Sequence, residues 1–216
     1  MSDNILEMRD ICKSFSGVQV LKDVNFNVRR GEVHALCGEN GTGKSTLMKV
    51  LSGVYPYGDY SGEIIFNGKE AHFHNVKESE DAGIGIIHQE LALVSYLSIA
   101  ENLFLGSQKP TTKMGSINWN ETNHQAKDIL ARVGLHEPVM TPVGQLGVGK
   151  QQIVEIGKVL AKDVSLLVLD EPTAALNDND SEVLLDLVRD LRDSGVSIVI
   201  ISHKLNEIEA IADRTT

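Results

Sequence analysis

The chain has 216 residues, of which 42% are hydrophobic and 23% charged, and its formal net charge at pH 7 is −10. This length and apolar fraction suffice for one sizeable domain with a buried core, and they do not indicate disorder. The acidic balance argues against a sequence-independent nucleic-acid binder, which needs a basic face to neutralise phosphates.

Alternating apolar and polar residues predict strands in the first part of the chain. In "DVNFNVRRGE", Val24, Phe26 and Val28 alternate with polar residues, which is the two-residue period of a half-buried strand. The apolar run "VHALCG" follows, and "GEIIFNGKEAHF" carries Asn67-Gly68 between β-prone flanks, the pattern of a hairpin. We therefore expect about the first eighty residues to be rich in antiparallel strand.

The middle of the chain has the periodicity of helices. "NWNETNHQAKDILARVGL" has one apolar helical face, with Asn118 as a candidate N-cap and Gly134 as a candidate C-terminal stop. "QQIVEIGKVLAK" repeats the helical spacing with Ile153, Ile156 and Leu160. We expect residues 91–162 to form a mainly helical subdomain.

Buried strands return in the last part. "SLLVLD" and "VSIVIIS" are continuous apolar runs, as in strands buried on both faces, and "SEVLLDLVRDLRDSG" between them has helical spacing. Strand, helix and strand joined by short links imply a parallel sheet. We expect residues 1–90 and 163–216 to form one α/β core together with the antiparallel part.

"EVHALCGENGTGKSTLMKVLSG" meets the conditions for a phosphate-binding loop. Such a loop needs a buried strand before it, a helix N-terminus and converging backbone N–H groups facing the phosphates, and a hydroxyl after the lysine for Mg²⁺. Residues 32–37 are the expected strand, and Leu47, Val50 and Leu51 begin an apolar helical face. We predict a nucleotide phosphate site, with Lys44 also acting in catalysis, at Gly38, Glu39, Asn40, Gly41, Thr42, Gly43, Lys44, Ser45 and Thr46.

"VGQLGVGKQQ" repeats the bare glycine-lysine pattern at Gly144 and Gly149-Lys150. Here Pro142 precedes the stretch instead of a buried strand, and Gln151 stands where the hydroxyl belongs. A second nucleotide cradle is therefore disfavoured, and a glycine-rich turn opening the helix that contains Ile153 is the plain alternative.

Polar side chains at strand exits are candidates to complete the site. Asp170 ends "LLVLD" and is expected to hold Mg²⁺ together with Ser45, whereas Glu171 can orient and deprotonate an attacking water. The alternative is that both acids form only a polar strand exit. His203 closes "IVIISH" and can hold Glu171 and the water in line.

Two further candidates come from earlier in the chain. Gln89 ends "GIGIIHQ", where its amide can reach Mg²⁺ or the water. Phe15 in "CKSFSG" can stack on adenine, or serve only in core packing.

This ordered series resembles the ATPase domain of ABC transporters: Phe15, "GENGTGKST", the Gln89 loop, a helical insert, a glycine-rich turn, "LLVLDEPTAAL" and "ISH". The resemblance covers nearly the whole chain. It implies an α/β P-loop NTPase core of ABC ATPase type, formed by residues 1–216 as a single domain with an N-terminal antiparallel β subdomain and a helical subdomain insert. ATP and Mg²⁺ are the cofactors that it implies.

The resemblance also gives the second glycine-rich turn a role. It occupies the place of the Leu-Ser-Gly-Gly-Gln signature, which contacts the γ-phosphate of ATP bound to the opposite subunit. The implied contacts in trans are Gly147, Val148, Gly149, Lys150 and Gln151, of which Gly147, Val148 and Lys150 depart from the family pattern. Asn177 stands where the family usually has an aspartate that communicates across the dimer.

Two stretches resemble the ATPase sequences of importers of monosaccharides such as xylose, ribose or galactose: "GVQVLKDVNFNVRRGEVHALCGENGTGKSTLMKVLSGVYP" and "KQQIVEIGKVLAK". These importers pair two ATPase domains in one polypeptide, and we expect this chain to be the first half, cut after His203. The implied partners are a second ATPase domain, transmembrane permease subunits and, indirectly, a sugar-binding protein, but no nucleic acid. The implied location is the inner face of the cell membrane, as a cytoplasmic peripheral protein.

Two other functions are compatible with a nucleotide-binding domain of this kind. A soluble ABC ATPase acting on ribosomes or DNA is disfavoured by the acidic charge, and a nucleotide-binding module that never hydrolyses is disfavoured by Glu171 and His203. His72 and His74 share one face of an expected strand, but no third metal ligand is evident, so we expect solvent-exposed side chains.

Overall fold

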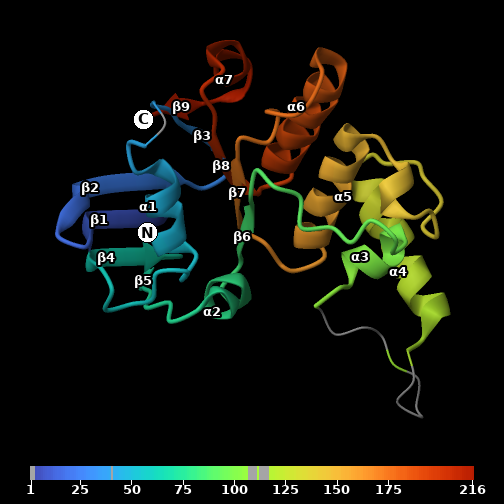
Figure 1. The fold of residues 1–216 in the computed structure, drawn as a ribbon, viewed down its shortest axis with the longest axis horizontal. Helices are drawn as coiled ribbons and strands as arrows, with labels where there is room; N and C mark the ends of the chain where they lie inside the picture. Colours follow the sequence, from blue (N-terminus) through green and yellow to red (C-terminus); the bar gives the residue numbers. More distant parts are fainter. Residues whose placement is uncertain (1–2, 40, 107–110, 112–116) are drawn as a thin grey trace. The chain divides into compact units, whose positions relative to one another are not determined.

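The structure is a computed structural model that describes residues 3–39, 41–106, 111 and 117–216. It divides into two units, which are treated separately below (Figure 1). The first unit comprises Met1–Ile86, Val164–Pro172 and Val188–Thr216, and the second comprises Ile87–Asp163 and Thr173–Leu187. Within the described ranges, no helix is both long enough and apolar enough to cross a membrane.

An antiparallel sheet forms one part of the first unit. Its strand order is β2-β1-β4-β5, with bounds Val18–Arg29, Asn4–Phe15, Ser61–Phe66 and Lys69–Glu70. The predicted alternation in β2 is confirmed, since Phe26 and Val28 are buried and their polar neighbours are exposed. Asn67 and Gly68 connect β4 to β5 with φ of 53° and 74°, the positive values that a tight hairpin turn requires.

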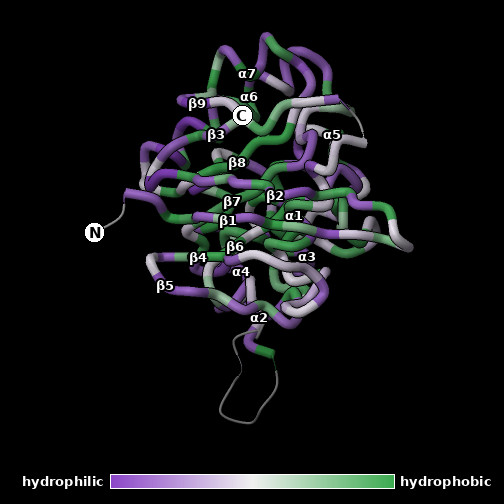
Figure 2. Tube along the Cα trace, turned by 90° about the vertical axis from the view of Figure 1, so that its left-hand side faces the viewer, coloured by the Kyte–Doolittle hydropathy of each residue, from purple (hydrophilic) through white to green (hydrophobic). Residues whose placement is uncertain are grey.

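A second sheet in the first unit has the order β6-β7-β8-β3-β9. The strands are Ile84–Ile87, Leu166–Asp170, Ser197–Ile201, Val33–Leu36 and Arg214–Thr215. The predicted parallel pairing of β7 with β8 is confirmed, and β3 also pairs parallel with β8 and with β9. Every residue of β8 is buried, which explains its unbroken apolar run (Figure 2).

Helix α1 (Lys44–Leu51) supplies one apolar face to the core of the first unit. Leu47, Met48, Val50 and Leu51 are buried in a single hydrophobic cluster that also takes in residues of both sheets. The helix is therefore fixed from both sheets, which matters because the candidate phosphate loop lies at its N-terminus. Two short helices, α2 (Val76–Asp81) and α7 (Leu205–Ile211), complete this unit.

The second unit is helical, as predicted. It contains α3 (Ile99–Leu103), α4 (Trp119–Arg132), the 3₁₀ turn η1 (Val143–Gln145) and α5 (Val148–Leu160). Asn118 caps α4 by accepting a hydrogen bond from the Glu121 N–H, and Gly134 follows the helix with φ 67°. A Cβ on Gly157 would lie 3.2 Å from Ile129 and 3.3 Å from Leu103, so this glycine lets α5 approach both α4 and α3 closely.

Helix α6 (Asp178–Asp193) starts in the second unit and ends in the first. Residues 173–187 pack with the helical unit, which corrects the expectation that all of residues 163–216 belong to the α/β core. The physical reason lies in the first turn of α6, where the Asp180 side chain lies directly against Gly149 of α5.

His34 on β3 is a buried titratable group of the first unit, with 2% of its surface exposed. Its Nδ1 lies 3.2 Å from Glu32 and 3.0 Å from Arg214, and its Nε2 lies 2.8 Å from the Thr216 hydroxyl. Burial lowers the pKa of His34, and the hydrogen bond with Glu32 opposes that shift.

This lowered pKa predicts that acid weakens the first unit. Between the folded and the unfolded pKa, the unfolded chain binds more protons on this imidazole, so stability is lost as the pH falls below the unfolded value of about 6.5. We expect His34→Gln to lose less melting temperature than wild type on acidification from about pH 7.5 to about pH 5.5. Exposed His124 provides the control, since His124→Gln should follow the wild-type profile. Parallel profiles for wild type and His34→Gln would contradict the assignment.

Candidate functional site

Three strands of the parallel sheet end at the same level and release their loops on one edge. In the register, Leu36 of β3 pairs with Ile201 of β8, and Ile201 pairs with Asp170 of β7. The carboxyl ends of parallel strands form the usual ligand crevice of such sheets. The segments starting at Cys37, Glu171 and Ser202 are thus brought together, although they lie far apart in the sequence.

The predicted phosphate loop joins β3 to α1. Gly38, Gly41 and Gly43 have φ of 153°, 85° and 104°, in the region that favours glycine, and Asn40 lies outside the described residues. A Cβ on Gly43 would meet the Leu21 side chain at 2.9 Å, so the loop also passes tightly against β2. The N–H groups of the first turn of α1, including that of Thr46, have no partner inside the helix and can receive an anion.

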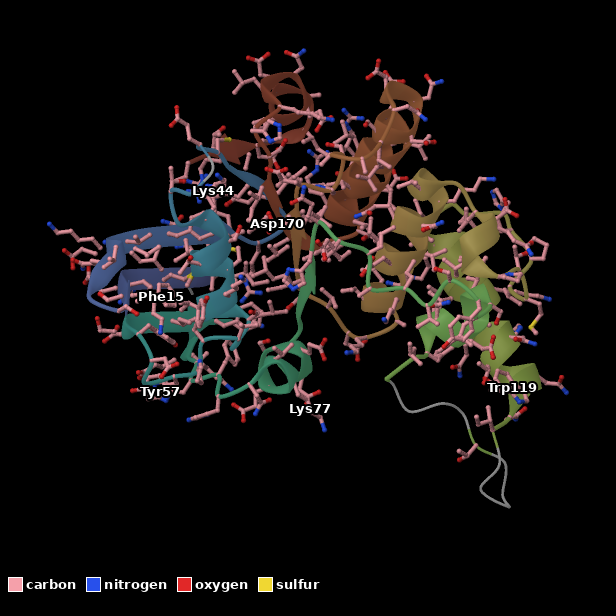
Figure 3. The ribbon with its side chains drawn as sticks, viewed as in Figure 1. Phe15, Lys44, Tyr57, Lys77, Trp119 and Asp170 are labelled. Atoms are coloured by element: carbon pink, nitrogen blue, oxygen red, sulfur yellow. The ribbon has the colours of Figure 1, made fainter. Side chains whose placement is uncertain are left out.

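Lys44 points back over this loop (Figure 3). Its Nζ donates to the carbonyl oxygens of Gly38 at 2.7 Å and Glu39 at 2.8 Å, and the Thr42 hydroxyl donates to the same Glu39 carbonyl at 3.0 Å. The ammonium is therefore held at the loop by weak acceptors that a phosphate oxygen can replace. Burial raises the pKa of the neighbouring Cys37 thiol, which Lys44 partly offsets, so the thiol stays protonated at neutral pH.

The predicted acids and histidine lie beside the loop. Ser45 Oγ is 3.5 Å from Asp170 Oδ2, so a hydroxyl and a carboxylate oxygen, the donors that Mg²⁺ prefers, face each other. Glu171 Oε1 is 3.1 Å from His203 Nδ1, and the Glu171 N–H donates to the Ile201 carbonyl at 2.9 Å. Glu171 has φ 47°, a left-handed conformation that is uncommon outside glycine, and its side chain is mostly buried.

Phe15 lies at the end of β1 and is half-buried (Figure 3). Its ring packs edge-on against Tyr55, with centroids 5.2 Å apart. The Phe15 ring is therefore partly packed against Tyr55 and partly exposed. Both predicted roles, stacking on adenine and core packing, are compatible with this position.

Gln89 follows β6 by two residues and is exposed. It belongs to the second unit, so the geometry above, which lies in the first unit, does not include it. Its role at the metal stays a prediction.

The second glycine-rich turn opens a helix and follows no strand. Gly147 is the N-cap of α5, Val148 is exposed, and the Gln151 amide donates to the Leu146 carbonyl at 2.8 Å. Lys150 Nζ lies 2.6 Å from Glu137 Oε1. The extra charge of this turn is therefore already paired within the same chain.

Asn177 caps the first turn of α6. Its Oδ1 accepts from the Asp180 N–H and its Nδ2 donates to Asp180 Oδ2, both at 2.9 Å. Because Asp180 in turn lies against Gly149, Asn177 and the glycine-rich turn are in contact through one carboxylate.

Sequence reasoning missed Lys13, Glu137 and Asp180. The position of Lys13 could have been predicted, because it lies two residues from both Ile11 and Phe15 and so on the same face of β1. The structure shows that Lys13 is buried. No sequence pattern indicates a role for Glu137 or Asp180, because their contacts depend on how distant segments pack.

His72 and His74 are exposed, as expected, with Nε2 of His72 2.8 Å from Glu70 and Nδ1 of His74 3.1 Å from Glu78. His72 also stacks on Tyr57, with ring centroids 3.9 Å apart. Over the described part of the chain, no group of three or more potential metal-ligating side chains is present.

Comparison with known proteins gives consistent matches. The profile of the family described as "ABC transporter" matches residues 21–174. The L-arabinose transport ATP-binding protein AraG of Geobacillus stearothermophilus is 66% identical, and the xylose import ATP-binding protein XylG of Moorella thermoacetica is 55% identical; each match covers 100% of this chain. The chain spans 42% of the length of these two curated relatives.

Solved structures agree with this. A crystal structure of a nucleotide-free ATP-binding cassette from an ABC transporter superimposes with a TM-score of 0.83 at 26% identity, covering 97% of this chain and 85% of that one. The ADP form of the ATP-binding cassette MJ1267 also gives 0.83, at 25% identity, covering 98% and 86%. The predicted fold class, an α/β ATPase core with an antiparallel sheet and a helical insert, is confirmed.

The contact between Gly149 and Asp180 predicts a steric test of the second turn. A methyl group at position 149 would lie 2.6 Å from Asp180 Cγ, and Asn177 holds that carboxylate in place. We expect Gly149→Ala to cost about 1–3 kcal/mol of unfolding free energy, measured by denaturant titration. Gly147→Ala meets nothing within 4 Å, and because this residue is the N-cap of α5 we expect a smaller loss, of at most about 1 kcal/mol. Equal losses in the two variants would show that the contact is not tight.

Proposed function

This chain belongs to the ABC transporter family, and from that premise we propose that it binds and hydrolyses ATP as the first ATPase half of a monosaccharide importer. The observation that carries the proposal is the arrangement in the first unit, where the Lys44 loop, the Ser45–Asp170 pair and the Glu171–His203 pair converge on one sheet edge.

We infer that the phosphate chain of ATP is bound by the backbone N–H groups of residues 38–46 and by the Lys44 ammonium. Lys44 exchanges the carbonyl oxygens of Gly38 and Glu39 for phosphate oxygens, which carry more negative charge. Phe15 supplies the stacking surface for adenine. A Mg²⁺ ion held by Ser45 and Asp170, with Gln89 as a further ligand, would neutralise charge on the phosphates when bound.

Glu171 acts as the general base. Its carboxylate lies next to Asp170 along the chain and is oriented by His203, 3.1 Å away, so both can align a water with the γ-phosphate. The Glu171 backbone is held beside the end of β8 by its N–H bond to the Ile201 carbonyl, and its left-handed φ of 47° is the kind of strain that functional sites retain.

The second glycine-rich turn acts on a nucleotide held by a second ATPase domain. Gly147, Val148, Gly149, Lys150 and Gln151 face that nucleotide, and Asn177 lies at the same contact. Lys150 is paired with Glu137 in this chain, which reduces the charge that the turn offers to a phosphate. We propose that this turn faces the less active of two composite sites.

The transported compound is inferred from the relatives. The proteins named for L-arabinose transport and xylose import match this chain over its whole length, and both sugars are monosaccharides. The partners are the second ATPase domain, membrane permease subunits and, through them, a sugar-binding protein. The chain works at the cytoplasmic face of the membrane, and we propose no nucleic-acid partner.

The role of Glu171 predicts a separation of binding from turnover. Glu171→Gln keeps the size of the side chain and removes the base, so phosphate release should fall about a hundredfold or more in the complete ATPase, with ATP affinity retained. Lys44→Ala is the companion variant and should lose ATP affinity itself. Undiminished phosphate release by Glu171→Gln would remove this residue from the base position.

A further inference from the structure

Lys13 is a buried ammonium that the proposed mechanism does not use. Its side chain on β1 is 8% exposed. The Nζ donates to the Asp59 carbonyl oxygen at 2.6 Å and lies 3.9 Å from the Asp59 carboxylate. Burying a lysine side chain costs free energy of folding unless its charge is compensated by nearby groups. The contacts with Asp59 provide part of that compensation.

Two aromatic rings provide the rest of that compensation. The Nζ lies 4.8 Å from the ring centroid of Tyr55 and 5.1 Å from that of Phe15. The two rings meet edge to face at 5.2 Å with an interplanar angle of 61°. Phe15 is therefore fixed by a cation over its ring and by a second ring at a favourable angle.

This cluster is attached to the phosphate-binding helix at two points. The Tyr55 N–H donates to the Lys49 carbonyl in the last turn of α1 at 3.0 Å. Lys13 pairs with Leu21 across β1 and β2, and the Leu21 side chain is the atom group that Gly43 must clear at the start of α1. The Phe15 ring is thus held in a fixed relation to the loop around Lys44.

We propose that Lys13 and Tyr55 are positioning residues that hold Phe15 as the stacking surface for the nucleobase of ATP. This inference rests on the proposed function, and it adds residues that set the affinity for the base. A ring that is already immobile loses less entropy when a base stacks on it. The ammonium also offsets the negative charge of the Phe15 π-face, which reduces repulsion against the π-electrons of a purine.

A role in packing alone gives a different expectation. If Lys13 only fills space beside Phe15 and Tyr55, a side chain of the same length without charge replaces it, and nucleotide affinity does not change. Lys13→Met is that substitution, and Lys13→Arg keeps the charge. Exposed Lys22 on β2 offers a matched control, Lys22→Met, which removes the same charge from the neighbouring strand.

The experiment measures equilibrium binding of two probes to the full chain, ATP and inorganic tripolyphosphate, each with Mg²⁺. Lys13→Met should weaken ATP binding about two- to thirtyfold and leave tripolyphosphate binding unchanged, because only ATP has a base to stack. In steady-state kinetics KM should rise while kcat stays the same. Lys13→Arg should recover most of the ATP affinity, and Lys22→Met should match wild type.

Tyr55 keeps the test decisive if Lys13→Met does not fold. Tyr55→Leu should weaken ATP selectively in the same way, and Tyr55→Phe, which keeps the ring, should not. Unchanged ATP affinity in folded Lys13→Met, or equal losses for ATP and tripolyphosphate, would overturn the inference. Wild type that fails to bind ATP, or Lys44→Ala that binds it normally, would instead overturn the proposed function.

Discussion

The parallel pairing of β3, β7 and β8 is the constraint on which the site depends. Leu36, Ile201 and Asp170 lie at one level of the sheet, so the three following segments leave from the same edge. A slip of one strand would carry the acid pair or His203 away from the phosphate loop. The unbroken apolar sequences of these strands serve the site by burying both faces of the sheet and fixing this register.

At this edge of the sheet, Lys44 and Glu171 are held in positions that suit ligand binding. Lys44 is bonded to two carbonyl oxygens of its own loop, and Glu171 is held in a left-handed conformation that costs roughly 1–3 kcal/mol. The buried core shared by α1 and the sheets holds both features in place, since it resists small displacements of the helix. In the first unit, the strained residue Glu171 thus lies at the site, and the hydrophobic core that supports the site is well packed.

Much of this could be predicted from sequence, because the relevant signals are local. The alternation in β2, the apolar runs of β7 and β8, and the strand and helix flanking "GENGTGKST" each depend on neighbouring residues only. The pairing of Lys150 with Glu137 and the approach of Asp180 to Gly149 depend on packing between distant segments, which no periodicity encodes. Lys13 is an intermediate case. Its place on the buried face of β1 follows from the two-residue period, but its contact with the Tyr55 ring, which compensates the buried charge, does not.

We propose that the loop around Lys44, and no other loop among the described residues, binds the triphosphate. A crystal structure of the full chain with a non-hydrolysable ATP analogue and Mg²⁺ tests it most directly. We expect phosphate density against the backbone N–H groups and Nζ around Lys44, with the metal between Ser45 and Asp170. Phosphate density at the Gly144–Lys150 turn of the same chain, with nothing bound at Lys44, would contradict it.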